Sequence, residues 1–248
     1  MNIALLGYGK MGKAIEAAAL QRGHTIGLKV GSSNAGTAPT GCDVAIEFSK
    51  PEHALANLRL CLNAGVPVVV GTTGWYDHLA EVKALVHEHN GSLLWASNFS
   101  IGVNLFFRLN KQLTRLMDPQ AAYHVHIDEV HHIHKLDAPS GTAITLARDI
   151  DLNSQRYSGW ALQSSGQAYS PLSTGEGTGV RPIPIASERT GEVPGKHSIS
   201  WTSEEDRIVI THEAFSRQGF ATGAVVAAEW LRGRTGLFTM DDVLDEVR

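Results

Sequence analysis

The sequence has few cysteines, no long apolar run and no excess of charge of one sign. Cys42 and Cys61 are the only cysteines in 248 residues, so we expect free thiols in a reducing, cytoplasmic compartment. The net charge is −4, so the chain lacks the excess of positive charge that is typical of nucleic-acid-binding proteins. Apolar runs such as Val66 to Val70 are far too short to cross a bilayer, and the N-terminus lacks the basic segment of a signal peptide. We therefore expect neither nucleic acid nor a membrane as a partner.

What remains is the composition of an ordinary folded protein. Apolar residues make up 43% of the chain and charged residues 19%, which is enough apolar material for a proper core. A length of 248 residues suits one large or two modest domains.

The first residues carry a glycine motif in an informative context. Asn2 to Leu6 is an apolar run of strand length, and a stretch of helix formers follows from Lys13 to Gln21. Between them, Gly7 allows a tight turn, Gly9 lets a pyrophosphate approach the backbone, and Gly12 lets helix and strand pack closely. The candidate dinucleotide-binding residues here are Gly7, Tyr8, Gly9, Lys10, Met11 and Gly12. The plainer alternative is an ordinary glycine-rich turn, and for Lys10 a solvated turn position.

Strand-like and helix-like segments alternate through the first hundred residues. The expected strands after the first are Thr25 to Val30, Asp43 to Phe48, Val66 to Gly71 and Leu93 to Ala96, and the expected helices are Pro51 to Asn63 and Asp77 to His89. This rhythm predicts a parallel sheet covered on both faces.

Ligands of such sheets bind beyond the carboxyl ends of the strands. Small and hydroxyl-bearing residues follow the fourth and fifth expected strands and permit close approach to a cofactor; plain turn chemistry is the alternative. These candidates are Gly71, Thr72, Thr73, Ala96, Ser97, Asn98 and Phe99.

The pattern changes after Ser100. Residues 102–117 predict one long amphipathic helix, and residues 121–131 alternate as a strand does. Further strands are expected at Arg181 to Ser187, His197 to Thr202 and Arg207 to Glu213, and helices at Ser140 to Ile150 and in the tail at Phe220 to Leu231 and Thr239 to Arg248. Residues 151–180, which include TGEGTG, are polar and predict a long mobile connection. An α+β second domain with a mixed or mostly antiparallel sheet accounts for this half.

The segment EVHHIHKLDAPSGTA, residues 129–143, is the most informative in the chain. His131, His132, His134 and Lys135 fall within five residues and run into Ser140, Gly141 and Thr142 at the expected start of a helix. A helix start with free N–H groups and hydroxyls binds anions. The segment therefore predicts a site that binds an acidic substrate and protonates it.

Together these motifs resemble the 4-hydroxy-tetrahydrodipicolinate reductase (dihydrodipicolinate reductase) family. The resemblance covers nearly the whole chain, and the central histidine segment is its most specific part. The segments that carry it are GYGKMG (7–12), DVAIEFSKPE (43–52), VVVGTTG (68–74), ASNFSIGVN (96–104), HHIHKLDAPSGTA (131–143), RTGEVPGKH (189–197) and GLFTMDDVL (236–244).

The resemblance implies an NAD(P)H-dependent oxidoreductase of lysine and diaminopimelate biosynthesis that acts on a small cyclic dicarboxylate. It implies His131 and Lys135 as the catalytic pair, either of which can supply the proton, and His132, Gly141 and Thr142 as substrate-binding residues. It also implies a Rossmann-type dinucleotide domain of residues 1–100 plus 216–248, and a substrate and oligomerisation domain of residues 101–215 that closes on it. A homotetramer is expected.

The cofactor is NADPH, NADH or both. NAD-specific sites place an acid about 20 residues after the glycines, but none lies between Glu16 and Asp43, and Gly31 occupies the expected position. Without that carboxylate a 2′-phosphate is not repelled, and Lys29 adds charge if it faces the pocket. We therefore predict that NADPH is used at least as well as NADH.

Other interpretations remain open. His131, His132, His134 and Asp137 are potential metal ligands, but neighbouring histidines point in different directions and Lys135 repels a cation, so we expect no metal. The histidines can also be purely structural. A non-catalytic NAD(H)-sensing regulator and a Rossmann reductase of another cyclic imine or keto acid are the alternative functions.

Overall fold

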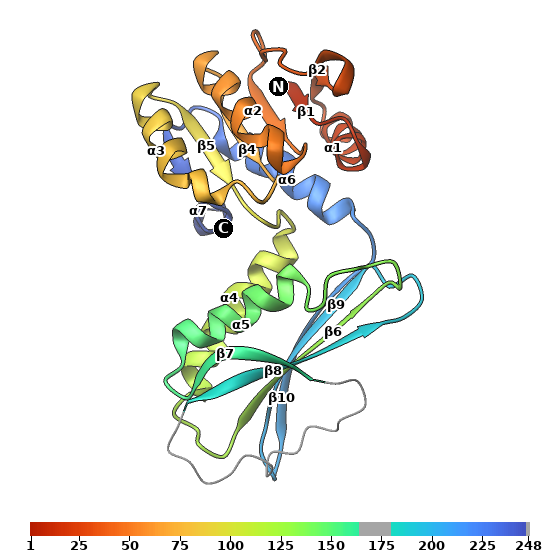
Figure 1. The fold of residues 1–248 in the computed structure, drawn as a ribbon, viewed down its shortest axis with the longest axis vertical. Coiled ribbons are helices and arrows are strands. Elements are labelled where there is room, and N and C mark those ends of the chain that lie inside the picture. Colours follow the sequence, from red (N-terminus) through yellow and green to blue (C-terminus); the bar gives the residue numbers. More distant parts are fainter. Residues whose placement is uncertain (164–179, 247–248) are drawn as a thin grey trace. The chain divides into compact units, whose positions relative to one another are not determined.

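A computed structural model describes residues 1–163 and 180–246. The chain forms two compact units, residues 1–104 with 217–248 and residues 105–216. We call them unit 1 and unit 2 (Figure 1). Unit 2 is therefore inserted into unit 1. The chain passes from unit 1 to unit 2 after residue 104 and returns after residue 216, close to the expected boundaries at residues 100 and 216.

Unit 1 is built on a six-stranded sheet in the order β11-β5-β4-β3-β1-β2. Every neighbouring pair is parallel, which confirms the predicted Rossmann-type architecture. Its strands are β1 (Asn2–Leu6), β2 (Thr25–Val30), β3 (Val44–Glu47), β4 (Val68–Val70), β5 (Ser92–Trp95) and β11 (Gly236–Phe238).

Helices cover both faces of this sheet. The helices are α1 (Lys10–Gln21), α2 (Pro51–Asn63), α3 (Leu79–Glu88), α6 (Gln218–Leu231) and α7 (Met240–Glu246), with short 3₁₀ turns at Ser32–Asn34 and Tyr76–His78. Alternation along β1 divides the core: Ile3 and Leu5 pack with residues of α1, α6 and α7, whereas Ala4 and Leu6 pack with residues of α2 and α3. The β-strand period of two therefore produces two apolar layers.

Unit 2 contains a mixed five-stranded sheet in the order β10-β9-β6-β8-β7. The β10–β9 and β9–β6 pairs are antiparallel, whereas β6–β8 and β8–β7 are parallel. The strands are β6 (His124–His131), β7 (Tyr157–Gln163), β8 (Arg181–Arg189), β9 (Gly195–Thr202) and β10 (Arg207–Ala214). The mixed sheet confirms the predicted second part of the fold.

Two helices accompany this sheet, α4 (Ile101–Met117), which begins in unit 1, and α5 (Gly141–Asn153). They are tied together where Asn110 Nδ2 donates to the Leu146 carbonyl at 3.0 Å. Val125 and Ile127 of β6 and Ile199 and Trp201 of β9 are fully buried, as the alternation along residues 121–131 predicts for one face.

Two strands, β7 and β11, were not predicted from the sequence. β7 lies inside residues 151–180, which were predicted as a mobile connection, and α5 also extends into that segment, to Asn153. β7 carries no alternation because it is an edge strand and its residues 158–162 are all exposed. Its register also shifts between Tyr157 and Trp160, around Gly159 with φ +66°. β11 has only three residues, so it carries no periodic signal. The TGEGTG motif lies outside the described residues. Within the described residues, no helix is long and apolar enough to cross a membrane.

Candidate functional site

The glycine motif forms the turn between β1 and α1. Gly7 has φ +99°, and a Cβ there would lie 2.1 Å from the Phe48 carbonyl oxygen. A Cβ on Gly12 would lie 2.3 Å from the Gly7 oxygen, whereas one on Gly9, the N-cap of α1, would meet nothing within 4 Å. Two of the glycines are thus required by close packing and the third leaves the helix start open. This is the division of roles that a dinucleotide-binding turn needs.

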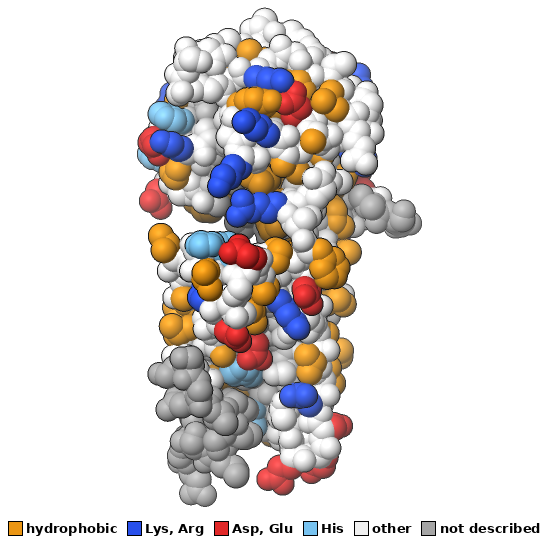
Figure 2. Space-filling view, turned by 90° about the vertical axis from the view of Figure 1, so that its right-hand side faces the viewer, with side chains coloured by type: hydrophobic (Ala, Val, Ile, Leu, Met, Phe, Trp, Pro, Cys, Tyr) orange, Lys and Arg blue, Asp and Glu red, His pale blue; other side chains and the backbone are white. Residues whose placement is uncertain are grey.

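Two clefts of unit 1 lie beside this turn. One, of about 380 Å³, is lined by Gly9, Lys10, Met11, Phe48, Ser49, Pro51, Gly71, Thr72 and Thr73. The other, of about 410 Å³, is lined by Gly7, Tyr8, Gly9, Val30, Gly31, Ser32, Ala35, Gly36, Phe48, Ser49, Lys50, His53, Ala56, Asn57 and Leu60. Seen from the side of α1 and β2, Lys and Arg side chains gather on this unit (Figure 2), which suits an anionic ligand.

A buried acid, which sequence reasoning did not single out, supports the shared wall of the clefts. Glu47 ends β3 and is fully buried. Its Oε1 accepts hydrogen bonds from Asn57 Nδ2 at 3.1 Å and from the Ser49 hydroxyl. Ser49 N–H in turn donates to Thr72 Oγ1 at 2.8 Å. The loops after β3 and β4 are therefore held together at the carboxyl ends of the strands.

Two of the four candidate cofactor residues that follow β5, Asn98 and Phe99, are buried. Phe99 is 1% exposed and Asn98 8% exposed, and Asn98 Oδ1 caps Ser100 N–H at 2.9 Å. Ser97 is exposed and Ala96 half-buried. None of the four lines either cleft, so their contact with a cofactor stays a prediction.

Gly31, the position of the missing acid, lines the larger cleft. Its φ of −121° is open to any residue, and a Cβ would meet nothing within 4 Å. Lys29 faces elsewhere: its Nζ lies 2.5 Å from Glu16 Oε1 and 4.9 Å from the centre of the Tyr8 ring. Lys29 is therefore not among the residues that line this cleft, because it pairs with Glu16 of α1. Lys50 is the lysine that does line it.

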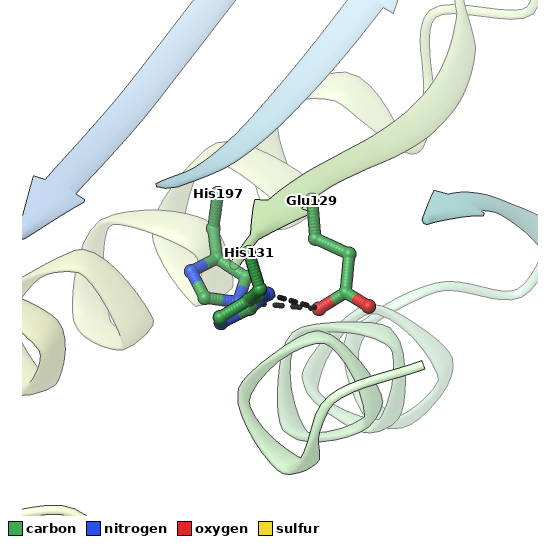
Figure 3. Close-up of side chains that lie close together, drawn as sticks. All are labelled: Glu129, His131 and His197. Atoms are coloured by element: carbon green, nitrogen blue, oxygen red, sulfur yellow. Dashed lines mark ion pairs between the residues drawn. The ribbon is translucent and has the colours of Figure 1, made fainter. Parts of the chain in front are cut away.

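In unit 2, Glu129 is the centre of the second candidate site (Figure 3). The carboxylate is 1% exposed, and its Oε1 accepts from Ser140 N–H at 2.9 Å, Ser187 Oγ at 2.8 Å and Arg189 Nη2 at 3.0 Å. Burial raises the pKa of Glu129, but hydrogen bonds from His197, Ser140 and Ser187 outweigh it and hold that pKa well below its ordinary value. Glu129 is therefore a buried anion.

His131 and His197 both turn a ring nitrogen to the other oxygen of Glu129. His131 Nδ1 lies 3.4 Å and His197 Nε2 3.5 Å from Oε2, and the ring centres are 5.0 Å apart. Burial, followed by the charge of His197, lowers the pKa of His131 to about 4 although Glu129 acts in the opposite direction. The His131 imidazole is thus neutral at neutral pH in the unliganded protein.

Lys135 lies in the loop that follows. Its Nζ donates to Asp137 Oδ1 and Oδ2 at 2.8 and 2.9 Å, and this bond lowers the pKa of Asp137. Arg189 Nη2 also donates to the Asp137 carbonyl at 2.5 Å, so the guanidinium joins the loop to Glu129. His132 is half-buried, and its ring lies 6.0 Å from that of the exposed His134.

Ser140 caps α5 as predicted. Its Oγ accepts from Ala143 N–H at 3.2 Å and lies 3.0 Å from His197 Nε2. Gly141 and Thr142 begin the helix, where N–H groups lack an intrahelical acceptor. Gly141 is exposed, and a Cβ there would meet nothing within 4 Å. The helix start can therefore take a carboxylate.

Of the predicted residues, His131 and Ser140 meet at the Glu129 carboxylate, and Lys135 is linked to it through Asp137 and Arg189. His134 instead pairs with the exposed Glu192. The structure adds Glu129, Ser187, Arg189 and His197 to the predicted residues. Glu129 lies directly across from His197 in the β6–β9 pair and beside Ser187 in the β6–β8 pair. Strand alternation places Glu129 and His131 on one face, which was a usable signal. The strand register that places His197 of β9 and Ser187 of β8 beside Glu129 cannot be predicted from a single sequence.

The same cluster has the spacing of a metal site. One ligand atom each of Glu129, His131 and His197 lies within 4.8 Å of the others. Arg189, however, is paired with the same carboxylate at 3.0 Å, and its fixed charge opposes a bound cation. The arrangement is better described as a buried carboxylate shared by cationic and imidazole donors.

Comparison with known proteins decides the family. Residues 1–99 match the family model described as dihydrodipicolinate reductase, N-terminus, and residues 102–244 match the one described as dihydrodipicolinate reductase, C-terminus. The chain belongs to the dihydrodipicolinate reductase family. The resemblance inferred from the motifs is thereby confirmed.

Relatives within the family cover 92% of this chain or more. A 4-hydroxy-tetrahydrodipicolinate reductase of Christiangramia forsetii is 45% identical over 100% of this chain and 99% of its own length. One of Neisseria meningitidis is 37% identical, over 92% and 83%. The dipicolinate-bound dihydrodipicolinate reductase of Paenisporosarcina sp. TG-14 shares the fold with a TM-score of 0.71, at 24% identity and over 96% and 97% of the two chains.

Proposed function

We propose that this chain reduces 4-hydroxy-tetrahydrodipicolinate to tetrahydrodipicolinate with NAD(P)H, in lysine and diaminopimelate biosynthesis. The observation that carries the proposal is the Glu129 carboxylate, which faces His131 and accepts from Ser140 N–H at the start of α5. Lys135 is linked to the same carboxylate through Asp137 and Arg189, and the chain is matched along its length by the dihydrodipicolinate reductase models. These groups suit a small dicarboxylate: a lysine ammonium, and N–H groups at a helix start.

The reaction needs a hydride, a proton and the departure of a hydroxyl group as water. The nicotinamide supplies the hydride when it is bound. Hydride addition leaves negative charge at the other end of the π-system, which His131 or Lys135 neutralises with a proton. His132, Ser140, Gly141 and Thr142 are proposed to hold the substrate carboxylates. Because His131 is neutral in the unliganded protein, it must gain a proton when the dianionic substrate binds if it is the donor.

Residues 1–100 plus 216–248 are the proposed dinucleotide domain. The clefts beside the glycine turn fit such a group, because Gly9 leaves the N-terminus of α1 open and Lys10, Thr72 and Thr73 line the approach. Gly7, Tyr8, Met11 and Gly71 also line the clefts, and Gly12 supports the turn. Since Gly31 leaves the ribose end without an acid, we propose that NADPH is used at least as well as NADH.

A homotetramer formed through unit 2 is part of the proposal. β10 is an eight-residue edge strand with exposed Ile208 and Val209, and long edges of this kind favour self-association. Cys42 and Cys61 are free thiols, so we keep the cytoplasm as the proposed location.

A coupled assay tests the activity. The substrate is made enzymatically in the cuvette, and purified protein is added while nicotinamide absorbance is followed. We expect stoichiometric loss of NAD(P)H with formation of tetrahydrodipicolinate. A chain that oxidises NAD(P)H with another cyclic imine or keto acid but not with this substrate would overturn the assignment, as would one that binds NAD(P)H without turnover.

A further inference from the structure

The two oxygens of the Glu129 carboxylate have different surroundings. Oε1 is saturated by Ser140, Ser187 and Arg189. Among the described residues, Oε2 has no hydrogen bond of regular geometry, although it is fully buried. The groups facing it are His131 Nδ1 and His197 Nε2, at 3.4 and 3.5 Å (Figure 3). One oxygen thus anchors the carboxylate and the other is directed at two imidazoles.

This geometry specifies which nitrogen of His131 carries the proton. An ionised carboxylate can only accept hydrogen bonds, so a lone pair on Nδ1 would face negative charge at 3.4 Å. Nδ1 is buried and has no other partner among the described residues. The Nδ1–H form of the ring is therefore the one that the surroundings stabilise.

The opposite edge of the ring lies over Gly195. A Cβ at Gly195 would be 3.1 Å from His131 Nε2 and 3.3 Å from Cδ2, closer than nearly all real contacts. Glycine at position 195 therefore keeps the space beside Nε2 free of a side chain. Carboxylate on one edge and glycine on the other define a single orientation of the imidazole.

We propose that Glu129 is the positioning residue of His131: its Oε2 is the acceptor that Nδ1–H faces, so that the ring receives its second proton at Nε2. The orientation of the ring is independent of the proposed function, whereas its catalytic consequence rests on that function. A proton from solvent adds to Nε2 when the dianionic substrate binds, and the Nδ1–H of the imidazolium remains directed at Glu129. Delivery of the Nε2 proton to the reduced ring returns His131 to the neutral state.

The charged groups around His131 agree with this assignment. Glu129 favours the imidazolium, whereas His197 from β9, Arg189 from β8 and Lys135 oppose it. Glu129 is the one anion among the groups that perturb the pKa of this ring. Its removal should therefore leave only groups that disfavour the positively charged imidazolium.

The orientation is measured directly by nitrogen-15 NMR of the histidine rings in substrate-free protein, with His131 assigned from the signals missing in His131→Gln. We expect a protonated Nδ1 and an unprotonated Nε2. Glu129→Gln has the same shape, but its amide can donate to Nδ1, so the proton should move to Nε2. Ser187→Ala is the matched control: it removes one hydrogen bond from Oε1 and should leave Nδ1 protonated.

Kinetics test the consequence. In Glu129→Gln we expect kcat to fall at least about tenfold at neutral pH and its pH profile to shift towards acid, with the KM for NAD(P)H unchanged. A wild-type ring protonated at Nε2, or a Glu129→Gln ring still protonated at Nδ1, would overturn the positioning role. If Glu129→Gln does not fold, the wild-type spectrum alone decides. A protonated Nδ1 in a protein without reductase activity would instead remove the proposed function and leave the positioning intact.

Discussion

Gly31→Asp should reverse the choice of cofactor. The substitution restores the acid that NAD-specific sites place at the end of the second strand. The structure accepts it, because φ at Gly31 is −121° and a Cβ there would meet no atom within 4 Å. An effect on selectivity can then be separated from an effect on folding.

Two contributions set the magnitude. A carboxylate a few ångströms from a 2′-phosphate of charge near −2 costs NADPH roughly 2 kcal/mol in a solvent-filled cleft. A charged hydrogen bond to the 2′-hydroxyl of NADH contributes about 1.5 kcal/mol or more. The sum, about 3.5 kcal/mol, corresponds to a shift of roughly 400-fold in selectivity towards NADH.

The assay is the ratio of kcat/KM for NADPH and NADH, measured for the unmodified chain, Gly31→Asp and Gly31→Asn. The asparagine has nearly the same size without the charge, so it should shift the ratio far less. An unmodified enzyme that favours NADH more than about tenfold, or an aspartate variant with an unchanged ratio, would refute the reasoning.

Four further predictions follow from the geometry. His131→Gln and Lys135→Ala should each lower kcat by roughly 10²-fold with little change in NAD(P)H affinity; near-normal turnover in both would remove their assignment. Dialysis against a chelator should not change activity, and stoichiometric zinc whose removal abolishes turnover would show the opposite. Light scattering at micromolar concentration should give a tetramer, and a monomer alone would contradict the proposed assembly. Gly12→Ala should lower the free energy of unfolding by about 1–3 kcal/mol, measured by thermal unfolding, because its Cβ would lie 2.3 Å from the Gly7 oxygen. Gly9→Ala should unfold at the same temperature as the unmodified chain but bind NAD(P)H weakly. Equal losses of stability in the two variants would be inconsistent with the two glycine roles.

Local patterns in the sequence were sufficient for most of unit 1. The apolar run of β1, the glycine turn and the proline at the start of α2 each encode their own conformation, and α2 spans Pro51–Asn63 as predicted. β11 could not be found this way because a three-residue parallel strand is defined by its partner β5, not by its own pattern.

The candidate site in unit 2 divides in the same way. His131, Lys135 and Ser140 are close in sequence, so their proximity could be predicted. Glu129 and His197 are 68 positions apart and meet because they are register partners in the β6–β9 pair. The direction of Lys29 was likewise undetermined, because it depends on an ion pair with Glu16 that propensities do not contain.

The inserted arrangement of unit 2 has a consequence for synthesis on the ribosome. The alanine-rich α6 fills the core against β1, β3 and α1, and β11 pairs with the edge of β5. Both follow unit 2 in the sequence and are therefore made after it. Until they emerge, one apolar face of the sheet formed by the first hundred residues is covered by α1 but not by α6, while residues 105–216 already hold the five described strands of their own sheet. The inserted unit can therefore fold before unit 1 is complete, and the nascent sheet of unit 1 needs protection from aggregation until α6 and β11 have been made.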